Sequence, residues 1–370
     1  MRKFGRVLIT CIKNAKLFPM FELQYLPFES AKMETYNVLK AEIHASRALS
    51  ELKGIANVIP SQFLLVNSIV LQESKNSSEI ENIVTTQDEL YRGLSETATT
   101  IDPATKEVMF YREALYIGLD ALKKHKFISI NDIVNIQKVV VQNDGGIRSL
   151  PGTKIVNERT NTVVYVPPQT KEEIDAYLKN FTEYLNNDDD SLVKLAVLHH
   201  QFESIHPFYD GNGRTGRILN ILYLILKGHL DLPILYLSSY IIKNKDYYYN
   251  LLQKVHTEND WESWILFILK GIEETAKETV EKVKNIKALL DTQSEKVKTE
   301  LPKIYSKELL ETVFENPYCK TEFVVRDLGV ERKTASRYLH KLEDIGILRC
   351  VKAGKDNLFI NDTLIKVLWA

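Results

Sequence analysis

The sequence predicts an all-α protein that carries a short β-hairpin in its core and a small helical domain with two strands near its C-terminal end. Apolar residues recur at helical spacing through most of the chain. Glycine and proline, which interrupt helices, make up only 15 and 11 of the 370 residues. Residues 156–168 and 347–360 each place strand-like residues on both sides of a turn, the pattern of a short hairpin.

The composition is that of a globular chain long enough for two or three domains. The formal net charge is −1 at pH 7, so no overall field favours nucleic acid or a membrane surface. Cys11, Cys319 and Cys350 lie far apart and match no disulfide framework or metal spacing, which fits a reducing compartment. No apolar run reaches transmembrane length, and we expect a cytoplasmic protein that does not enter a membrane.

Helical periodicity defines the elements in chain order. Before the hairpin it covers residues 29–52, 61–72, 103–126 and 130–141. After the hairpin it covers residues 171–185, 191–205, 218–227, 240–252 and 261–291. The Lys/Glu-rich run that leads to Pro302 is expected to be a helical linker. We therefore divide the chain into an N-terminal segment with a helix (1–59), a core (60–290) and a C-terminal domain (300–370).

The hairpin is predicted from residues 156–168, where Asn161 and Thr162 give a turn signal between β-branched stretches. A loop without regular structure fits the same residues, and local pattern alone leaves both alternatives open.

Residues 206–217, His-Pro-Phe-Tyr-Asp-Gly-Asn-Gly-Arg-Thr-Gly-Arg, join two predicted helices and hold most of the reactive groups of the chain. The second helix is expected to open near Asn212. A glycine-rich turn at a helix N-terminus presents unpaired N–H groups and the positive end of the helix dipole, which together bind anions. Gly211 and Gly213 carry no Cβ, so the backbone there is able to approach a phosphate closely.

The polar side chains of this stretch indicate phosphorus chemistry. Arg214 and Arg217 lie three residues apart on the new helix, where both guanidinium groups are placed to bind further phosphate oxygens. Asp210 is a hard oxygen ligand suited to Mg²⁺ beside a phosphate. His206 is able to accept a proton from a hydroxyl near neutral pH. The combination predicts nucleotidyl or phosphoryl transfer.

The stretch is similar at every fixed position to the signature loop of Fic-domain proteins, His-x-Phe-x-Asp/Glu-Gly-Asn-Gly-Arg-x-x-Arg. Members of that family typically move AMP from ATP to a Ser, Thr or Tyr hydroxyl of a target protein. The resemblance covers roughly residues 60–275. It implies that His206 is the general base, that Phe208 anchors the loop and that Asp210 binds Mg²⁺. It further implies that the phosphates of ATP are held by Gly211, Asn212, Gly213, Arg214 and Arg217.

A second motif, Ser77-Ser78-Glu79-Ile80-Glu81-Asn82, resembles the inhibitory helix of Fic proteins, Ser/Thr-x-x-x-Glu-Gly/Asn. Ser77 and Glu81 are four residues apart and share a helix face. By resemblance, Glu81 pairs with Arg217 and fills the space that the γ-phosphate of ATP needs, with Asn82 at the last position of the motif. From the residues alone, the motif also fits an exposed capping segment.

Two further sets of site residues follow from the resemblance. Fic proteins carry a hairpin flap that aligns the target by strand pairing, which places Thr162, Val163, Val164, Tyr165 and Val166 in the target-docking strand. An aromatic residue from the helix after the loop often lies near the nucleotide base, and Tyr248 and Tyr249 are the candidates. His199 and His200, one to two turns before the loop, are expected to be packing groups.

The C-terminal domain resembles a winged helix-turn-helix, with three helices followed by a hairpin at residues 347–360. Basic residues on its third helix would line an outward face, namely Arg332, Lys333, Arg337 and Lys341. Winged helices also dock proteins, and the local excess of positive charge is small. The sequence therefore favours a protein-binding or self-association role, such as a homodimer, over DNA binding.

We expect an autoinhibited protein adenylyltransferase that uses ATP and Mg²⁺ and modifies a protein substrate of unknown identity; self-modification stays open, since no site for it stands out. Three alternatives stay open: removal of AMP (de-AMPylation), transfer of another nucleotidyl or phosphate-containing group, and a DNA-binding regulator in which the Fic core is a sensor.

Overall fold

The computed structural model describes residues 23–29, 33–56, 62–95, 101–157, 162–353 and 356–369. It confirms the predicted all-α class: the described chain consists of helices with two small antiparallel sheets. The helices before the first sheet are α1 (Tyr36–Ile55), α2 (Gln62–Ile80), α3 (Gln87–Leu94), α4 (Pro103–His125) and α5 (Ile130–Val141). The core then continues with α6 (Lys171–Asn186), α7 (Leu192–Ile205), α8 (Asn212–Leu226), α9 (Leu237–Lys243), α10 (Lys245–Glu258) and α11 (Trp261–Glu300).

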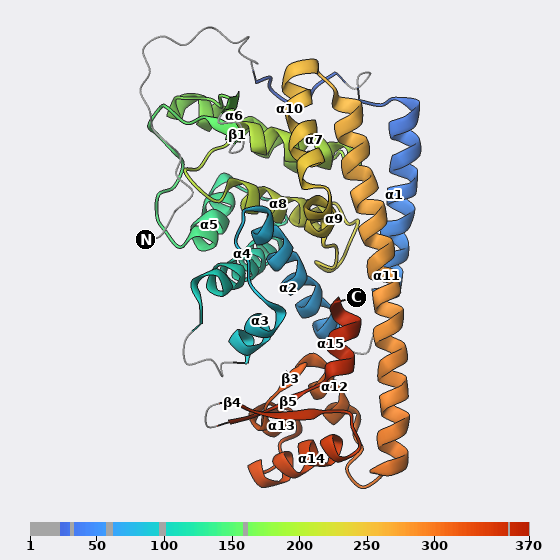
Figure 1. Ribbon diagram of the computed structural model, residues 1–370. Helices are drawn as coiled ribbons and strands as arrows, with labels where there is room; N and C mark the ends of the chain where they lie inside the picture. Colours follow the sequence, from blue (N-terminus) through green and yellow to red (C-terminus); the bar gives the residue numbers. More distant parts are fainter. Residues whose placement is uncertain are drawn as a thin grey trace.

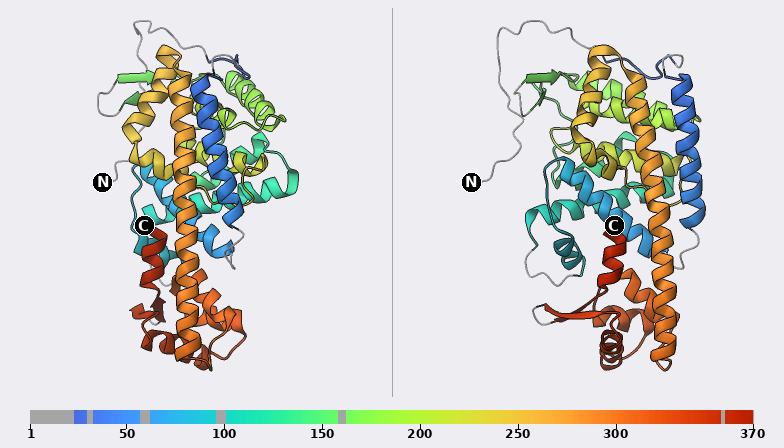
Figure 2. Two further views of the ribbon diagram at one scale, coloured as in Figure 1. Left: turned by 90° about the vertical axis from the view of Figure 1, so that its right-hand side faces the viewer. Right: turned by 45° about the vertical axis from the view of Figure 1, so that its right-hand side comes forward.

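The long helix α11 extends along the whole molecule, with α1 beside its first half and the C-terminal elements packed at its far end (Figures 1 and 2). Its buried residues follow helical spacing as far as Val297, through the Lys/Glu-rich stretch for which the sequence predicts a linker. The helix therefore crosses the predicted boundary between the core and the C-terminal domain without a break.

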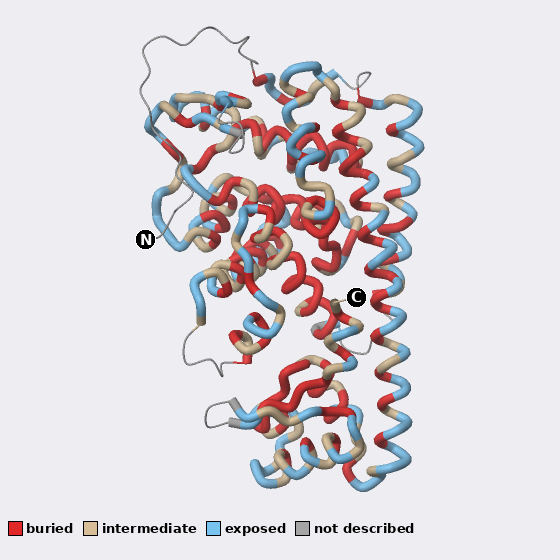
Figure 3. Tube along the Cα trace, in the orientation of Figure 1, coloured by how far each residue is buried: buried red, intermediate tan, exposed pale blue. Residues whose placement is uncertain are grey.

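Helices α7 and α8 occupy the centre of the core, and almost all of their residues are buried (Figure 3). A helix that is apolar around its whole circumference is buried from all sides by its neighbours. α8 packs against α4, α5 and α7, so the turn between α7 and α8 is supported from three directions.

The predicted hairpin is present as β1 (Ile155–Asn157) and β2 (Thr162–Tyr165), paired antiparallel with Val156 opposite Val163. The tip of the hairpin lies outside the described residues. Tyr165 is buried and stacks on His256 of α10 at 4.0 Å between ring centroids, which fixes the end of the hairpin on the core.

Helix α2 is longer than the sequence pattern suggested. The pattern ends near Gln72, but the structure continues the helix through the Ser/Asn-rich stretch to Ile80. Ser and Asn compete with helix formation unless their side chains find partners. Here Ser74 Oγ donates to Val70 O at 2.6 Å and Ser77 is fully buried against Arg217, so tertiary contacts override local propensity.

The C-terminal elements are α12 (Lys307–Glu315), β3 (Tyr318–Cys319), α13 (Thr321–Leu328), α14 (Arg332–Asp344), β4 (Arg349–Ala353), β5 (Asp356–Ile360) and α15 (Asp362–Trp369). The helices and the hairpin match the prediction. β3 joins that hairpin in the sheet order β3-β5-β4, so the sheet has three strands and not the expected two. Helix α15 was also missed. It packs against α11, where Lys282 Nζ donates to Leu368 O at 2.6 Å and to Gln72 Oε1 of α2 at 2.8 Å.

Among the described residues, no helix is both long and apolar enough to cross a bilayer.

Candidate active site

The site is built on the turn between α7 and α8, residues 206–211. α7 ends at Ile205, and its C-cap His206 has left-handed backbone angles (φ 46°, ψ 60°) with its N–H bonded to Phe202 O at 3.0 Å. Gly211 is also left-handed (φ 79°), and a Cβ there would lie 2.6 Å from Val141 Cγ1. Glycine is required at this point both by the backbone conformation and by the neighbouring side chain.

Phe208 and Asn212 lock the turn in place. Phe208 is fully buried between the helices, as expected for an anchor. The Asn212 side chain accepts from Phe208 N at 2.9 Å and donates to Phe208 O at 2.8 Å. Both ends of the amide are therefore engaged in holding the turn, and the group of Asn212 that remains for an anion is its backbone N–H.

The N-terminus of α8 has the properties of an anion site. No side chain caps it, and the first intrahelical bond is donated by Thr215 N to Gly211 O at 2.9 Å. The N–H groups of Asn212, Gly213 and Arg214 precede that bond and carry the positive end of the helix dipole. Such a terminus binds phosphate groups without further positive charge.

Arg217 lies one turn into α8 and is bound to the end of α2. Its Nε donates to Ser77 Oγ at 2.8 Å and its Nη2 to Ser77 O at 2.9 Å. Nη2 also forms an ion pair with Glu81 Oε1 at 2.7 Å. Ser77 and Arg217 are buried, whereas the Glu81 side chain remains 35% exposed. The two sequence motifs therefore meet at one guanidinium group.

Charge coupling stabilises this contact. Burial opposes the ionised form of Glu81, but the charge and hydrogen bond of Arg217 outweigh it and lower the pKa of the carboxyl. The charge of Glu81 in turn raises the pKa of Arg217, although burial alone would lower it. A methyl group at Gly213 would collide with Glu81 Oε1 and lie 2.9 Å from Arg217 Nη1, so only glycine lets the carboxylate come this close.

Asn82 ends the second sequence motif, residues 77–82, for a conformational reason. Its φ is 61°, in the left-handed region that Gly and Asn tolerate best. Ile83 N then bonds Ser78 O at 3.0 Å and closes the last turn of the helix. Lys245 Nζ of α10 donates to Asn82 Oδ1 at 3.0 Å. This geometry accounts for the Gly/Asn preference at the last position of the motif.

Three parts of the chain match models of known protein families. Residues 127–224 match the model of the Fic/DOC family, and residues 39–120 match the Fic/DOC family N-terminal model. Residues 289–364 match the model of the C-terminal domain of SoFic-like protein adenylyltransferases. The chain therefore contains a Fic/DOC domain at residues 127–224, preceded by a Fic/DOC N-terminal region.

Curated relatives carry the same family name. The protein adenylyltransferase Fic of Nematostella vectensis is 29% identical over 174 residues, which is 46% of this chain and 38% of the relative. The protein of that name from Aedes aegypti is 30% identical over 164 residues, 43% of this chain and 31% of the relative. The match thus spans well under half the length of these relatives.

A solved structure shares the fold over most of the chain. A Fic family protein from Desulfovibrio desulfuricans aligns with a TM-score of 0.59 at 17% identity, covering 88% of this chain and 96% of that one. This chain therefore shares its fold with that structure over most of its length.

His206 is a neutral imidazole on the Fic turn. Burial, helped by the nearby charge of Arg148, lowers its pKa to about 4. A backbone hydrogen bond at Glu203 acts in the opposite direction on this pKa and is outweighed by burial. The ring is therefore unprotonated at neutral pH and available as a proton acceptor.

Arg214 and Asp210 line the outer side of the turn. Arg214 is buried and pairs with Glu107 of α4 at 3.2 Å, and its Nη2 lies 3.6 Å from Asp210 Oδ1. Asp210 Oδ1 accepts from Gly211 N at 2.6 Å, while 72% of the side chain remains exposed. Gln137 of α5 donates to Asp210 O at 2.9 Å and holds the backbone below.

The described residues hold no cluster of three or more metal-binding side chains. One exposed carboxylate beside an anion site nevertheless fits Mg²⁺, which proteins usually bind through one or two carboxylates together with substrate phosphates. Asp210 is the residue that would hold it.

Tyr248 and Tyr249, the two base-contacting candidates, differ in their surroundings. Tyr248 is buried, and its hydroxyl lies 2.9 Å from His199 Nε2. Tyr249 is 43% exposed, with its ring 5.1 Å from that of Tyr248. Tyr249 is thus the member of the pair that a ligand in solvent is able to contact. Burial lowers the pKa of His199 to about 3, so it is a neutral packing group, as expected.

The target-docking candidates lie on β2 and just after it. Val163 and Val166 are each 40% exposed, whereas Tyr165 points into the core. The sheet has two strands among the described residues, so no further strand covers the outer edge of β2.

Sequence reasoning missed three ionisable residues near the site: Glu73 and Arg148, which are buried, and Glu203, whose Oε1 is buried. Glu73 of α2 accepts from Ser238 N at 3.0 Å and ties that helix to α9. Glu203, one turn before His206, has a buried Oε1 without a hydrogen-bond partner, and burial raises its pKa to about 7. None belongs to a recognisable local motif, because each contacts elements far away in the sequence.

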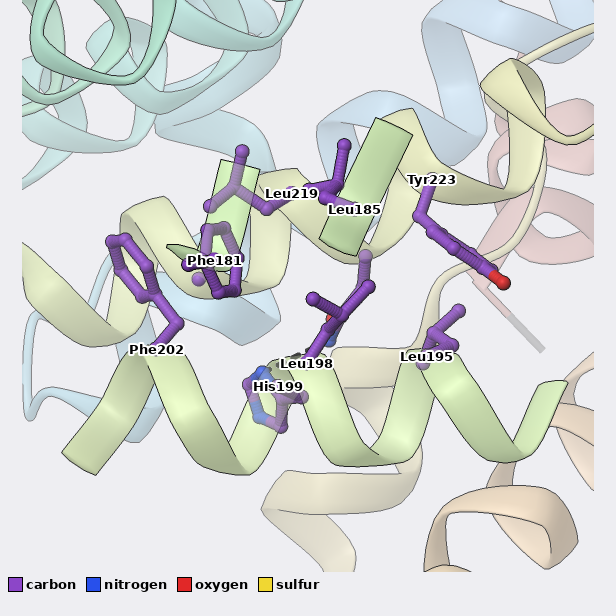
Figure 4. Close-up of a pocket in the computed structure, with 10 residues that line it drawn as sticks. Phe181, Leu185, Leu195, Leu198, His199, Phe202, Leu219 and Tyr223 are labelled. Atoms are coloured by element: carbon purple, nitrogen blue, oxygen red, sulfur yellow. Dashed lines mark hydrogen bonds between the residues drawn. The ribbon is translucent and has the colours of Figure 1, made fainter. Parts of the chain in front are cut away.

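A cavity of about 10 Å³ lies between α6, α7 and α8, lined mostly by apolar side chains such as Leu198, Phe202 and Leu219 (Figure 4). It holds at most one water molecule. It is a packing gap in the core and not a substrate site.

Proposed function

We propose that the chain transfers AMP from ATP to a Ser, Thr or Tyr hydroxyl of a protein and that Glu81 holds this activity in check. The observation that carries the proposal is the contact of Glu81 with Arg217 beside the uncapped N-terminus of α8. A carboxylate on a buried arginine stands where a phosphate oxygen of a nucleotide would bind. The names of the curated relatives point to the same reaction.

ATP would bind with its α-phosphate at the N–H groups of residues 212–214. Arg214 and Arg217 would then bind the β- and γ-phosphates, Arg217 after release from Glu81. The target hydroxyl oxygen forms a bond to the α-phosphorus while the bond from that phosphorus to the bridging oxygen breaks. Pyrophosphate leaves, and AMP stays on the target. The N–H groups and arginines stabilise the charge that develops.

His206 accepts the hydroxyl proton. Its low pKa keeps the imidazole neutral at physiological pH. Anionic phosphates bound close by would raise that pKa again, because a nearby negative charge favours the imidazolium. Asp210 would hold Mg²⁺, which supplies charge neutralisation for the phosphates of ATP.

The target would reach His206 by pairing with the outer edge of β2. Main-chain hydrogen bonds of this kind align an extended peptide without selecting its sequence, and the exposed Val163 and Val166 would contact its side chains.

The C-terminal elements would dock a protein, such as a second copy of this chain, and not DNA. Basic residues at the start of α14 are already engaged in part, since Arg332 Nη1 lies 2.6 Å from Glu322 Oε1. The formal net charge of the chain is −1, so long-range attraction to a duplex is weak.

The reaction is tested by identifying the group transferred. The Glu81→Gly variant is incubated with Mg²⁺ and ATP labelled at either the α- or the γ-phosphate, alone and with a cell lysate. Stable protein label from α-labelled but not γ-labelled ATP is expected. Label from the γ-position would show phosphoryl transfer and contradict the proposal.

A further inference from the structure

Arg148, in the segment before the hairpin, is fully buried, and within the described part of the chain its side chain bonds only to backbone carbonyls of two other segments. Its Nε donates to His206 O at 2.7 Å and its Nη2 to Ile205 O at 3.3 Å. Nη2 also donates to Pro168 O. No carboxylate forms an ion pair with this guanidinium among the described residues, so its contacts serve to hold backbone.

Two of the three carbonyls belong to the end of α7. The last carbonyls of a helix lack intrahelical donors, and a cation at that end interacts favourably with the helix dipole. Arg148 supplies both the donors and the charge, and one of the carbonyls is that of His206 itself. The backbone extends this contact: Arg148 N donates to Pro207 O at 2.9 Å, and Ile147 forms a β-bridge with Phe208.

The third carbonyl belongs to the base of the flap. Pro168 lies three residues after β2, next to Gln169. The Gln169 side chain accepts from Gly152 N at 2.7 Å and donates to Thr153 O at 3.1 Å, on the segment that enters β1. The chain entering the flap and the chain leaving it are thereby joined, and Arg148 connects the joined base to the end of α7.

We infer that Arg148 is a positioning residue that fixes the carbonyl end of His206 relative to the flap, so that the base and the docked target keep one geometry. The inference rests on the proposed function for its catalytic meaning, but the mechanical link between the two segments does not. A planar guanidinium donates in several fixed directions, whereas a lysine ammonium at this place lacks the span to reach both segments.

The link is tested by hydrogen exchange of Arg148→Met and Arg148→Lys, each made in the Glu81→Gly chain. We expect residues 162–168 and 204–209 to exchange faster together, and residues 218–226 of α8 to keep their protection. Arg349→Met is the matched control, because Arg349 also donates two hydrogen bonds, to Asp362, but on the surface of the C-terminal elements. Unchanged exchange, or faster exchange in only one of the two segments, would overturn the inference.

The consequence for catalysis is tested by two measurements on the same variants. The first is the rate of self-labelling at a saturating concentration of α-labelled ATP, and the second is the affinity for ATP. Loss of alignment by about 1 Å costs on the order of 100-fold in rate, so Arg148→Met should lose about that much, and Arg148→Lys less. ATP affinity should not change, since Arg148 contacts none of the proposed nucleotide-binding groups. A matching loss of affinity would assign Arg148 to the nucleotide site instead.

If the methionine variant does not fold, the lysine variant decides the question. A parent chain that labels nothing would count against the proposed function, while the exchange experiment would still decide the mechanical link.

Discussion

Replacing Glu81 tests how strongly the ion pair at Arg217 competes with ATP. Glu81→Gln keeps an oxygen that accepts a hydrogen bond from Arg217 Nη2, now 2.7 Å from Glu81 Oε1, but removes the negative charge. Glu81→Gly removes both the charge and the acceptor. ATP should bind more tightly to both variants, because its γ-phosphate no longer has to displace a carboxylate.

The size of the effect follows from the contact. A hydrogen bond to a charged group contributes about 1.5–3 kcal/mol, against about 0.5–1.5 kcal/mol for a neutral one. We take the middle of the first range, about 2 kcal/mol, for Glu81→Gly, because solvent screens a carboxylate that is 35% exposed. At ~1.4 kcal/mol for each factor of ten, the Kd for ATP should fall about 30-fold. Glu81→Gln should lower the Kd by about fivefold, for a loss of about 1 kcal/mol.

The assay is calorimetric titration of each variant with ATP and Mg²⁺ at pH 7.5. Glu79→Gly is the matched control, since Glu79 lies at the same helix end but pairs with Lys75 at 2.8 Å and not with Arg217. An unchanged Kd in Glu81→Gly, or an equal gain in Glu79→Gly, would refute the view that Glu81 occupies a phosphate position.

Three further predictions concern stability, each checked by chemical denaturation. Burial raises the pKa of Glu203 from 4.5 to about 7. The neutral side chain therefore makes its full contribution to the free energy of unfolding below pH 4.5, and this contribution is lost as the pH rises through 7. Glu203→Gln should therefore stabilise the protein at pH 8 by up to about 3 kcal/mol and have little effect at pH 4.5. Burial lowers the pKa of Lys282 to about 8, so the unfolded chain binds more protons than the folded chain from pH 8 to about 10.5, and stability rises over that window. Lys282→Met should abolish this rise, while Gln72 Nε2 continues to donate to Leu368 O. Phe208→Ala should cost about 3–5 kcal/mol, because Phe208 is fully buried beneath the turn.

The centre of the site was predictable because its signals are local. The turn between α7 and α8 depends on residues adjacent in sequence, and left-handed Gly211 at the start of α8 is the expected consequence of a glycine-rich turn. The contact between Glu81 and Arg217 joins distant segments, and only resemblance to a family supplied it. Structure then provides the reason for Asn82, whose left-handed conformation is invisible in a spacing pattern.

What could not be predicted depends on tertiary contacts. Arg148 follows an ordinary turn, and nothing in its neighbourhood indicates that its guanidinium reaches carbonyls at 168 and 206. The two-residue strand β3 is too short to show periodicity, and α15 is only eight residues long. The sequence pattern predicts too early an end for α2, because the polar second half of this helix is stabilised by buried partners that are distant in the sequence, such as Arg217 bound to Ser77.

The measurement that tests the account most directly is transfer of α-label from ATP by four chains: wild type, Glu81→Gly, His206→Ala and the double variant. The account predicts weak labelling by wild type, strong labelling by Glu81→Gly, and none by either chain that lacks His206. Strong labelling by the double variant would contradict the role of His206 as the base, and equal labelling by wild type and Glu81→Gly would contradict autoinhibition.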